Sequence, residues 1–345
     1  MPRILGAVLT FLIGAVAAGA QTSQVYLLRT GTIVDTSLGA AYVAQANGSI
    51  ERVDLSTGGG LWTSRSASLP IGASDAYVVG QADPSPFGTL AVVFLDVQSG
   101  VPVSEASIPL PAGAVSIVTP SQYSGFFTAS AEADGSDFVV RWYYISYPEI
   151  VDAPPAQYSG SARVDPRDGT VISAEGGAVT DVPEWYSNAS PPQPWQAGSV
   201  TASINEYSGG PILLKRTVTA TGQALPDVLL TNYGSVWPSL DTRDVMVEEQ
   251  YVYGGYRMRV VTIETGETIA DFLVATPVTS FVVFDGAIIS FTQPYVYVSG
   301  GHLIGVPGAV IALSLPTGVS KWSVIRRAPE QEGRAATPRS RSVRH

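Results

Sequence analysis

The stretch that decides the fold is Gly308-Ala-Val-Ile-Ala-Leu-Ser-Leu-Pro-Thr-Gly-Val-Ser-Lys-Trp322, near the end of the sequence. Its spacing is that of a pattern A-x-D-x-x-T-G-x-x-x-W, which it matches at Ala312, Thr317, Gly318 and Trp322. Ser314 stands where the pattern has Asp. Near the other end, Asp54-Leu-Ser-Thr-Gly-Gly-Gly-Leu-Trp62 keeps the Asp, Thr, Gly and Trp of the same pattern. The chain therefore contains a repeat.

The repeat has a direct physical interpretation. The apolar residues Ile50, Val53 and Leu55 alternate with polar ones, which predicts a strand. A tight turn is expected at Thr57-Gly58, because glycine adopts a positive φ at little cost. Leu61 and Trp62 would then run back as an antiparallel strand. One such sheet cannot bury both of its faces, so units of this kind form a closed ring.

Four weaker copies of the turn lie between these two. They are Asp96-Val-Gln-Ser-Gly100, Asp165-Pro-Arg-Asp-Gly169, Val218-Thr-Ala-Thr-Gly222 and Thr262-Ile-Glu-Thr-Gly266. The six glycines are separated by 42, 69, 53, 44 and 52 residues. The shorter intervals fit a four-stranded unit of about 40–45 residues. The 69-residue interval predicts either an extra degenerate unit or a large insertion.

The strand–turn–strand copies resemble the blade motif of quinoprotein-type (PQQ-like) β-propellers. This resemblance implies an all-β fold: a single β-propeller of four-stranded antiparallel blades, about seven in number, with six or eight as alternatives. It also implies that Trp62 and Trp322 dock between neighbouring blades, and we expect both to be core residues. Composition agrees, since charged residues are 14% while Gly (35) and Pro (25) are plentiful, as in folds with many short strands and turns.

The N-terminus predicts export. Residues 1–20 have the organisation of a signal peptide, with Arg3 before the apolar residues 4–17 and a cleavage signal at Ala18-Gly-Ala20. A membrane anchor is the alternative, but it needs about 20 apolar residues and a stop-transfer flank. We expect a secreted protein, extracellular or periplasmic, with a propeller domain over residues 21–327 and no membrane span. Residues 328–345 would be a disordered Arg-rich tail.

Cysteine is absent, although the chain is expected in an oxidising compartment. Stability must then come from burial and ring closure, and acylation at a lipoprotein cysteine is excluded. The net charge is −10, and without Arg3 and the Arg-rich end it is about −15 for the body. An acidic body argues against nucleic-acid binding, which requires a basic face.

The sequence contains few candidate catalytic residues. The body has one histidine, His302, and Ser299-Gly-Gly-His302 predicts a hairpin turn and not a Ser–His pair. Without cysteine, one histidine argues against a zinc site. We predict no catalytic, cofactor-binding or metal-ligating residue. The alternative is an enzyme: a quinone-dependent oxidoreductase, as the resemblance implies, or a hydrolase or lyase whose carboxylates converge on the axis.

One segment does not resemble a blade. Residues 183–196 are rich in proline, which favours a stiff extended loop, and they carry Trp185, Tyr186 and Trp195. Large aromatics on a stiff loop are typical anchors of interfaces, so we predict a binding loop. The alternative is an aromatic loop folded over its own blade. We therefore expect a non-catalytic, monomeric module that binds or scaffolds a protein or a glycan.

The sequence also contains two glycosylation sequons and one acidic turn, for which structural alternatives exist. Asn47-Gly-Ser49 and Asn188-Ala-Ser190 are N-glycosylation sequons, and Asn47-Gly is also a strong hairpin signal. The acidic turn over residues 132–137 places Asp134 and Asp137 close together, either as calcium ligands or as an ordinary hairpin turn.

Overall fold

The computed structural model describes residues 25–325, apart from 83–87, 116–125, 147–154, 187–190, 192, 206–209, 251–254, 276–277, 279, 293–294, 300–301 and 307. The predicted signal peptide, the predicted tail and Asn188 therefore lie outside the described residues. The described part consists of strands β1 to β27 and one short 3-10 helix, η1 (Glu184–Tyr186). The all-β prediction is confirmed.

Most strands belong to six antiparallel sheets, here called blades 1 to 6, in which they follow chain order. Blade 1 has five: β1 (Val25–Arg29), β2 (Thr32–Asp35), β3 (Ala40–Ala44), β4 (Ile50–Asp54) and β5 (Gly60–Ser64). Blade 2 has β6 (Leu69–Ala73), β7 (Tyr77–Gln81), β8 (Thr89–Asp96) and β9 (Pro102–Pro109). Blade 3 has β10 (Phe126–Asp134), β11 (Asp137–Ser146), β12 (Ala156–Val164) and β13 (Val171–Ala178).

The second half of the chain forms the other three blades. Blade 4 has β14 (Trp195–Ala197), β15 (Val200–Asn205), β16 (Ile212–Val218) and β17 (Val228–Thr231). Blade 5 has β18 (Ser235–Pro238), β19 (Asp244–Gln250), β20 (Tyr256–Thr262) and β21 (Thr268–Val274). Blade 6 has β22 (Phe281–Phe284), β23 (Ala287–Thr292), β26 (Ala309–Ser314) and β27 (Ser320–Ile325). An inserted hairpin, β24 (Tyr295–Ser299) with β25 (His302–Val306), places Ser299 opposite His302, as predicted.

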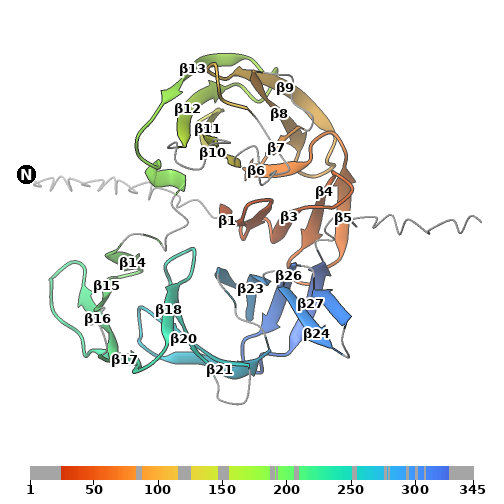
Figure 1. Cartoon of the computed structure of the whole chain (residues 1–345). Helices are drawn as coiled ribbons and strands as arrows, with labels where there is room; N and C mark the ends of the chain where they lie inside the picture. The colour runs from red at the N-terminus through yellow and green to blue at the C-terminus, as the bar shows by residue number, and fades with distance from the viewer. Residues whose placement is uncertain are drawn as a thin grey trace, which may run out of the picture.

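The blades follow one another around a ring in chain order (Figure 1). The described residues form six blades and not the seven that we expected, although six was among the alternatives. The long interval between Gly100 and Gly169 contains no additional sheet in the described part. It is spanned instead by the last strand of blade 2 and by three long strands of blade 3, of nine, ten and nine residues.

All six predicted turns are present, one in each blade between its last two strands. The six glycines, here called the turn glycines, have φ between 67° and 78°. Each donates its N–H to the carbonyl oxygen four residues earlier, at 2.8–2.9 Å. In the first turn the Asp54 carboxylate also accepts the backbone N–H groups and hydroxyls of Ser56 and Thr57, which lowers its pKa.

Four of the six turn glycines make room for a side chain of the preceding blade. A Cβ at Gly58 would lie 2.5 Å from the Trp322 ring, and one at Gly100 would lie 2.6 Å from the Trp62 ring. Phe272 occupies the same place over Gly318. Both tryptophans donate their Nε1–H to the next blade: Trp62 to the Val97 carbonyl oxygen at 3.0 Å and Trp322 to that of Leu55 at 2.9 Å. They dock between blades as expected, but they are half-buried and not fully buried.

Two other interfaces use polar contacts at the same level. The Ser104 hydroxyl of blade 2 donates to the Pro166 carbonyl oxygen of blade 3 at 2.5 Å. The Arg216 guanidinium of blade 4 lies over Gly266 of blade 5 and donates to the Glu264 carbonyl oxygen at 3.1 Å. Apolar clusters fill these two interfaces and the three with aromatic contacts, so five neighbouring pairs of blades share a core.

Candidate functional site

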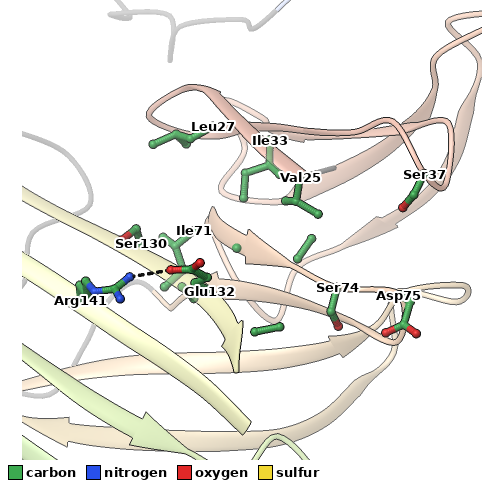
Figure 2. Close-up of a pocket in the computed structure, with 14 residues that line it drawn as sticks. Val25, Leu27, Ile33, Ser37, Ile71, Ser74, Asp75, Ser130, Glu132 and Arg141 are labelled. Atoms are coloured by element: carbon green, nitrogen blue, oxygen red, sulfur yellow. Dashed lines mark hydrogen bonds and ion pairs between the residues drawn. The ribbon is translucent and has the colours of Figure 1, made fainter. Parts of the chain in front are cut away.

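One cavity lies among the innermost strands of blades 1 to 3. It has a volume of about 700 Å³ and is here called the axial cavity. Val25 and Leu27 of β1 and Ile71 of β6 form its apolar side (Figure 2). Glu132 of β10 and Arg141 of β11 supply polar groups at one end of the cavity. Ser37, Ser74 and Asp75 supply polar groups at the other end.

The charged groups of the axial cavity are spread along it. Arg141 and Glu132 form an ion pair of 2.9 Å, with side-chain exposures of 35% and 64%. An exposed pair of this kind contributes at most about 1 kcal/mol to stability. Asp75 lies at the other end of the cavity, near Ser37 and Ser74 (Figure 2). Glu132 and Asp75 therefore do not form the converging carboxylate pair that an axial hydrolase would need.

The interface between blades 3 and 4 differs from the other five. One face of blade 3 packs on blade 2, and one face of blade 4 packs on blade 5. The two remaining faces point toward each other in the ring and carry rows of polar residues, although Tyr143 on the face of blade 3 is buried under Tyr186. Blade 3 presents a row of paired residues across its four strands: Ser130, Arg141, Ser161 and Glu175. Blade 4 presents Gln196, Thr201 and Thr217. These two polar rows and the space between them are here called the seam.

Among the described residues, the contacts that join the other blades have no counterpart at the seam. Ser173 stands four residues after Gly169, as Trp62 stands four residues after Gly58 in blade 1. Ser173 is exposed. A Cβ on Gly222, the turn glycine of blade 4, would meet nothing within 4 Å. No apolar cluster of the described residues joins blades 3 and 4. The ribbons of these blades also stand apart at the left of Figure 1.

An arginine at the seam makes a different contact from its counterparts. Arg52 and Arg216 each stand six residues before a turn glycine and donate to a backbone carbonyl of the next blade. Arg163 stands at the same place before Gly169. It pairs instead with Asp137, at 2.9 Å, and with Asp134 in the hairpin turn of its own blade. Burying the polar seam would leave hydrogen-bonding groups without partners, which accounts for the open interface.

A second cavity of about 420 Å³, here called the seam pocket, lies on the blade 3 side of the seam. Its lining includes Arg141, Ser161, Glu175 and Trp185. Arg141 thus lines both cavities. Two opposed glycines also contribute to the lining, and a Cβ on either would meet the Trp142 ring at 2.5–2.6 Å. The buried Trp142 therefore packs directly behind this wall of the pocket.

The predicted binding loop does not form one aromatic cluster. Trp185 is half-buried and lines the seam pocket. Tyr186 packs on Tyr143 of blade 3, with ring centroids 5.0 Å apart. Trp195 begins β14 on the face that packs against blade 5, so it is only 2% exposed, and its Nε1–H donates to the Pro191 carbonyl oxygen at 2.7 Å. The prediction of Trp195 as a binding anchor is corrected by this burial, and a binding role for Trp185 and Tyr186 stays a prediction.

The remaining predicted sites lie elsewhere. Asp134 and Asp137 belong to the β10–β11 hairpin turn and pair with Arg163, so the ordinary-turn alternative fits them. Within the described ranges there is no group of three His, Asp or Glu residues that could hold a metal ion. Asn47 is exposed in the β3–β4 hairpin, and its Oδ1 accepts from the Ser49 hydroxyl at 2.6 Å.

Arg141, Ser161 and Glu175 were not among the residues predicted from the sequence. The alternation of polar and apolar residues along β12 of blade 3 is a sequence signal for this polar face. Polar residues at 157, 159, 161 and 163 alternate there with Tyr158, Gly160, Ala162 and Val164. This pattern is typical of a sheet with one face in water.

Six antiparallel blades arranged about an axis define the protein as a β-propeller. No protein-family model matches the sequence, and no curated protein matches it. The chain is similar to the Cps50 (Swd1) β-propeller domain of Myceliophteria thermophila, at 13% identity over 84% of this chain and 94% of that one, with a TM-score of 0.28. The PQQ-like repeat itself stays a resemblance.

Two enzymes are also among the similar structures. A europium-containing methanol dehydrogenase has 13% identity over 83% of this chain and 67% of that one, with a TM-score of 0.26. The dihydro-heme d1 dehydrogenase NirN has 11% identity over 88% and 74%, with a TM-score of 0.34. Likenesses of this degree carry no information about ligand or reaction. Separately, no helix in the described part of the chain is long and apolar enough to cross a membrane.

Proposed function

We propose that this chain is an exported, non-catalytic β-propeller that binds a protein segment or a glycan at the seam between blades 3 and 4. The observation that carries the proposal is the open seam itself. Polar rows, an uncovered turn glycine and the seam pocket coincide there, whereas apolar clusters occupy the other five interfaces. The site is concave, and a small number of hydrogen-bonding groups converge there beside an aromatic side chain, as they do in ligand-binding sites.

Two features support the location. Trp185 stands at the edge of the seam pocket, on the segment expected to bind from its composition. Arg141, which lines both the seam pocket and the axial cavity, allows one side chain to contact a ligand in either place. Export rests on the signal-peptide organisation of residues 1–20.

The proposal is tested by selecting ligands and then altering the seam. The mature protein is screened against a glycan array and a displayed peptide library, and selected ligands are measured on Arg141→Ala and on Arg257→Ala. Arg257 makes a similar exposed ion pair with Asp271 on blade 5, at 2.7 Å, and serves as the matched control. We expect at least tenfold weaker binding to Arg141→Ala alone. Ligands that bind both variants as tightly as the wild type would contradict a seam site.

A further inference from the structure

We propose that the seam pocket takes a neutral sugar unit of a saccharide chain, stacked on the Trp185 ring and hydrogen-bonded by Arg141, Ser161 and Glu175. The inference rests on the proposed binding function and names the ligand class of that site. It follows from three properties of the pocket: an aromatic surface, a row of planar and hydroxyl hydrogen-bonding groups, and a carboxylate, Glu175, beside an arginine that already pairs with Glu132.

The Trp185 ring lies beside the ring of its sequence neighbour Tyr186. Tyr186 lies edge-on to it, with ring centroids 6.3 Å apart and an angle of 75° between the planes. Tyr186 is held in turn on Tyr143 and on Phe126 of blade 3. The indole therefore contributes an aromatic surface to a polar pocket, next to a tyrosine that packs on blade 3. A pyranose ring has an apolar C–H face that matches such a surface.

The polar wall of the pocket comes from three neighbouring strands in register. Arg141 of β11 pairs with Ser161 of β12, which pairs with Glu175 of β13. The Ser161 hydroxyl donates to Glu175 Oε1 at 3.1 Å, and Arg141 is held by Glu132. A guanidinium has five N–H donors and a carboxylate accepts at two oxygens, so each can bind two adjacent hydroxyls of a sugar. Adjacent strands lie about 4.8 Å apart, so these groups form a row along one wall of the pocket.

Charge favours a neutral sugar over an acidic one. Arg141 is flanked by Glu132 in the axial cavity and by Glu175 in the seam pocket. Because the charge of Arg141 is offset by its ion pair with Glu132, Glu175 is the uncompensated charge in the lining of the seam pocket, in a body that is itself acidic. A uronic acid or sulfated sugar would be repelled by that field.

The composition of the pocket favours a saccharide over a peptide. Much of its lining is serine and glycine, and Pro183 and Trp185 are its apolar members. The centre of a protein–protein interface is usually more apolar and receives anchor side chains in pockets. A sugar needs one apolar face and many hydrogen-bonding groups, which matches this lining.

The experiment titrates the mature protein with neutral hexasaccharides of glucose, xylose, mannose and N-acetylglucosamine, followed by calorimetry and tryptophan fluorescence. We expect at least one to bind, at least tenfold more weakly to Trp185→Ala and within about fivefold of wild type to Trp185→Phe. Glu175→Ala is expected to weaken binding, while Glu105→Ala, an exposed acid on the last strand of blade 2, leaves it unchanged. Thermal melts of all variants confirm that each is folded.

Three outcomes would overturn the inference. The first is that no neutral hexasaccharide binds. The second is that Trp185→Ala binds within twofold of wild type. The third is that a hexasaccharide of galacturonate binds more tightly than the neutral hexasaccharides. A parallel experiment with displayed peptides distinguishes failure of the saccharide inference from failure of the proposed binding function. A peptide that binds the wild type and is lost on Arg141→Ala would leave the binding function standing and reject the saccharide. Absence of both kinds of binding would reject the two proposals together.

Discussion

The Trp322 ring of the last blade lies over Gly58 of the first, and its Nε1–H donates to the Leu55 carbonyl oxygen at 2.9 Å. The first and last blades share no strand among the described residues. This contact, with the apolar cluster beneath it, therefore closes the ring between blades 6 and 1. The same device joins blades 1 and 2 through Trp62 and Gly100.

Removing either tryptophan should destabilise the fold. Trp322→Ala and Trp62→Ala each lose an interblade hydrogen bond and open a cavity, but both rings are half-buried. We expect a loss of about 2–3 kcal/mol, below the range of about 3–5 kcal/mol for fully buried tryptophan. Denaturant melts measure it. Leu61→Ala, an exposed neighbour of Trp62, is the control and should cost under about 1 kcal/mol. Unchanged melts of both tryptophan variants would contradict the docking.

The turn glycines should differ in their tolerance of alanine. Gly58→Ala places a Cβ against Trp322, whereas Gly222→Ala places one in open space. Both residues have positive φ, of 73° and 68°, so both variants carry the strain of about 1–2 kcal/mol of a non-glycine residue there. Overpacking should add about 1–3 kcal/mol for Gly58→Ala only. Equal losses in urea denaturation would show that Gly222 is as closely covered as Gly58.

Asp244 should make stability depend on pH. Burial, with a contribution from nearby Asp241, raises the pKa of Asp244 from 3.8 to about 6. The folded state then binds this proton more tightly than the unfolded state does. The resulting stability is fully present below pH 3.8 and is lost as the pH rises through about 6. A shift of about two units corresponds to roughly 3 kcal/mol.

Asp244→Asn stays neutral at every pH, so it should be more stable than wild type at pH 8 and equal to it near pH 4. Thermal melts from pH 4 to 8 measure the difference. Asp271→Asn is a control of opposite sign, because Arg257 lowers the pKa of Asp271. That variant should lose stability at pH 8 and lose little at low pH. A constant difference between Asp244→Asn and wild type across the range would show that this carboxyl group does not titrate as stated.

The blades themselves could be predicted from the sequence, because each copy contains its own turn. Six turn glycines with a Ser, Thr or Asp before them located the last strand pair of every blade. The blade count was less accurate. An interval of 69 residues between Gly100 and Gly169 was compared with a plain blade, whereas it contains the long strands of blade 3 and connections of 16 residues before β10 and 9 residues before β12.

The turn motif does not locate the seam, because it does not determine which side chains of one blade reach the next. Arg163 has the same spacing from its turn glycine as Arg52 and Arg216, yet it pairs within its own blade. Trp185 and Trp195 belong to one proline-rich segment, yet one lines the seam pocket and the other begins a buried strand. Composition indicates a stiff loop but not which aromatic ring it exposes.

The open seam is tested most directly by thiol labelling at two matched positions. The chain has no cysteine, so Ser104→Cys and Ser173→Cys each introduce a unique thiol. Both residues stand four positions after a turn glycine on the last strand of a blade. Ser104 bonds to blade 3 at 2.5 Å, while Ser173 is exposed on the face toward blade 4. We expect Ser173→Cys to react at least tenfold faster than Ser104→Cys under native conditions. Equal, slow labelling of the two would contradict an open interface between blades 3 and 4.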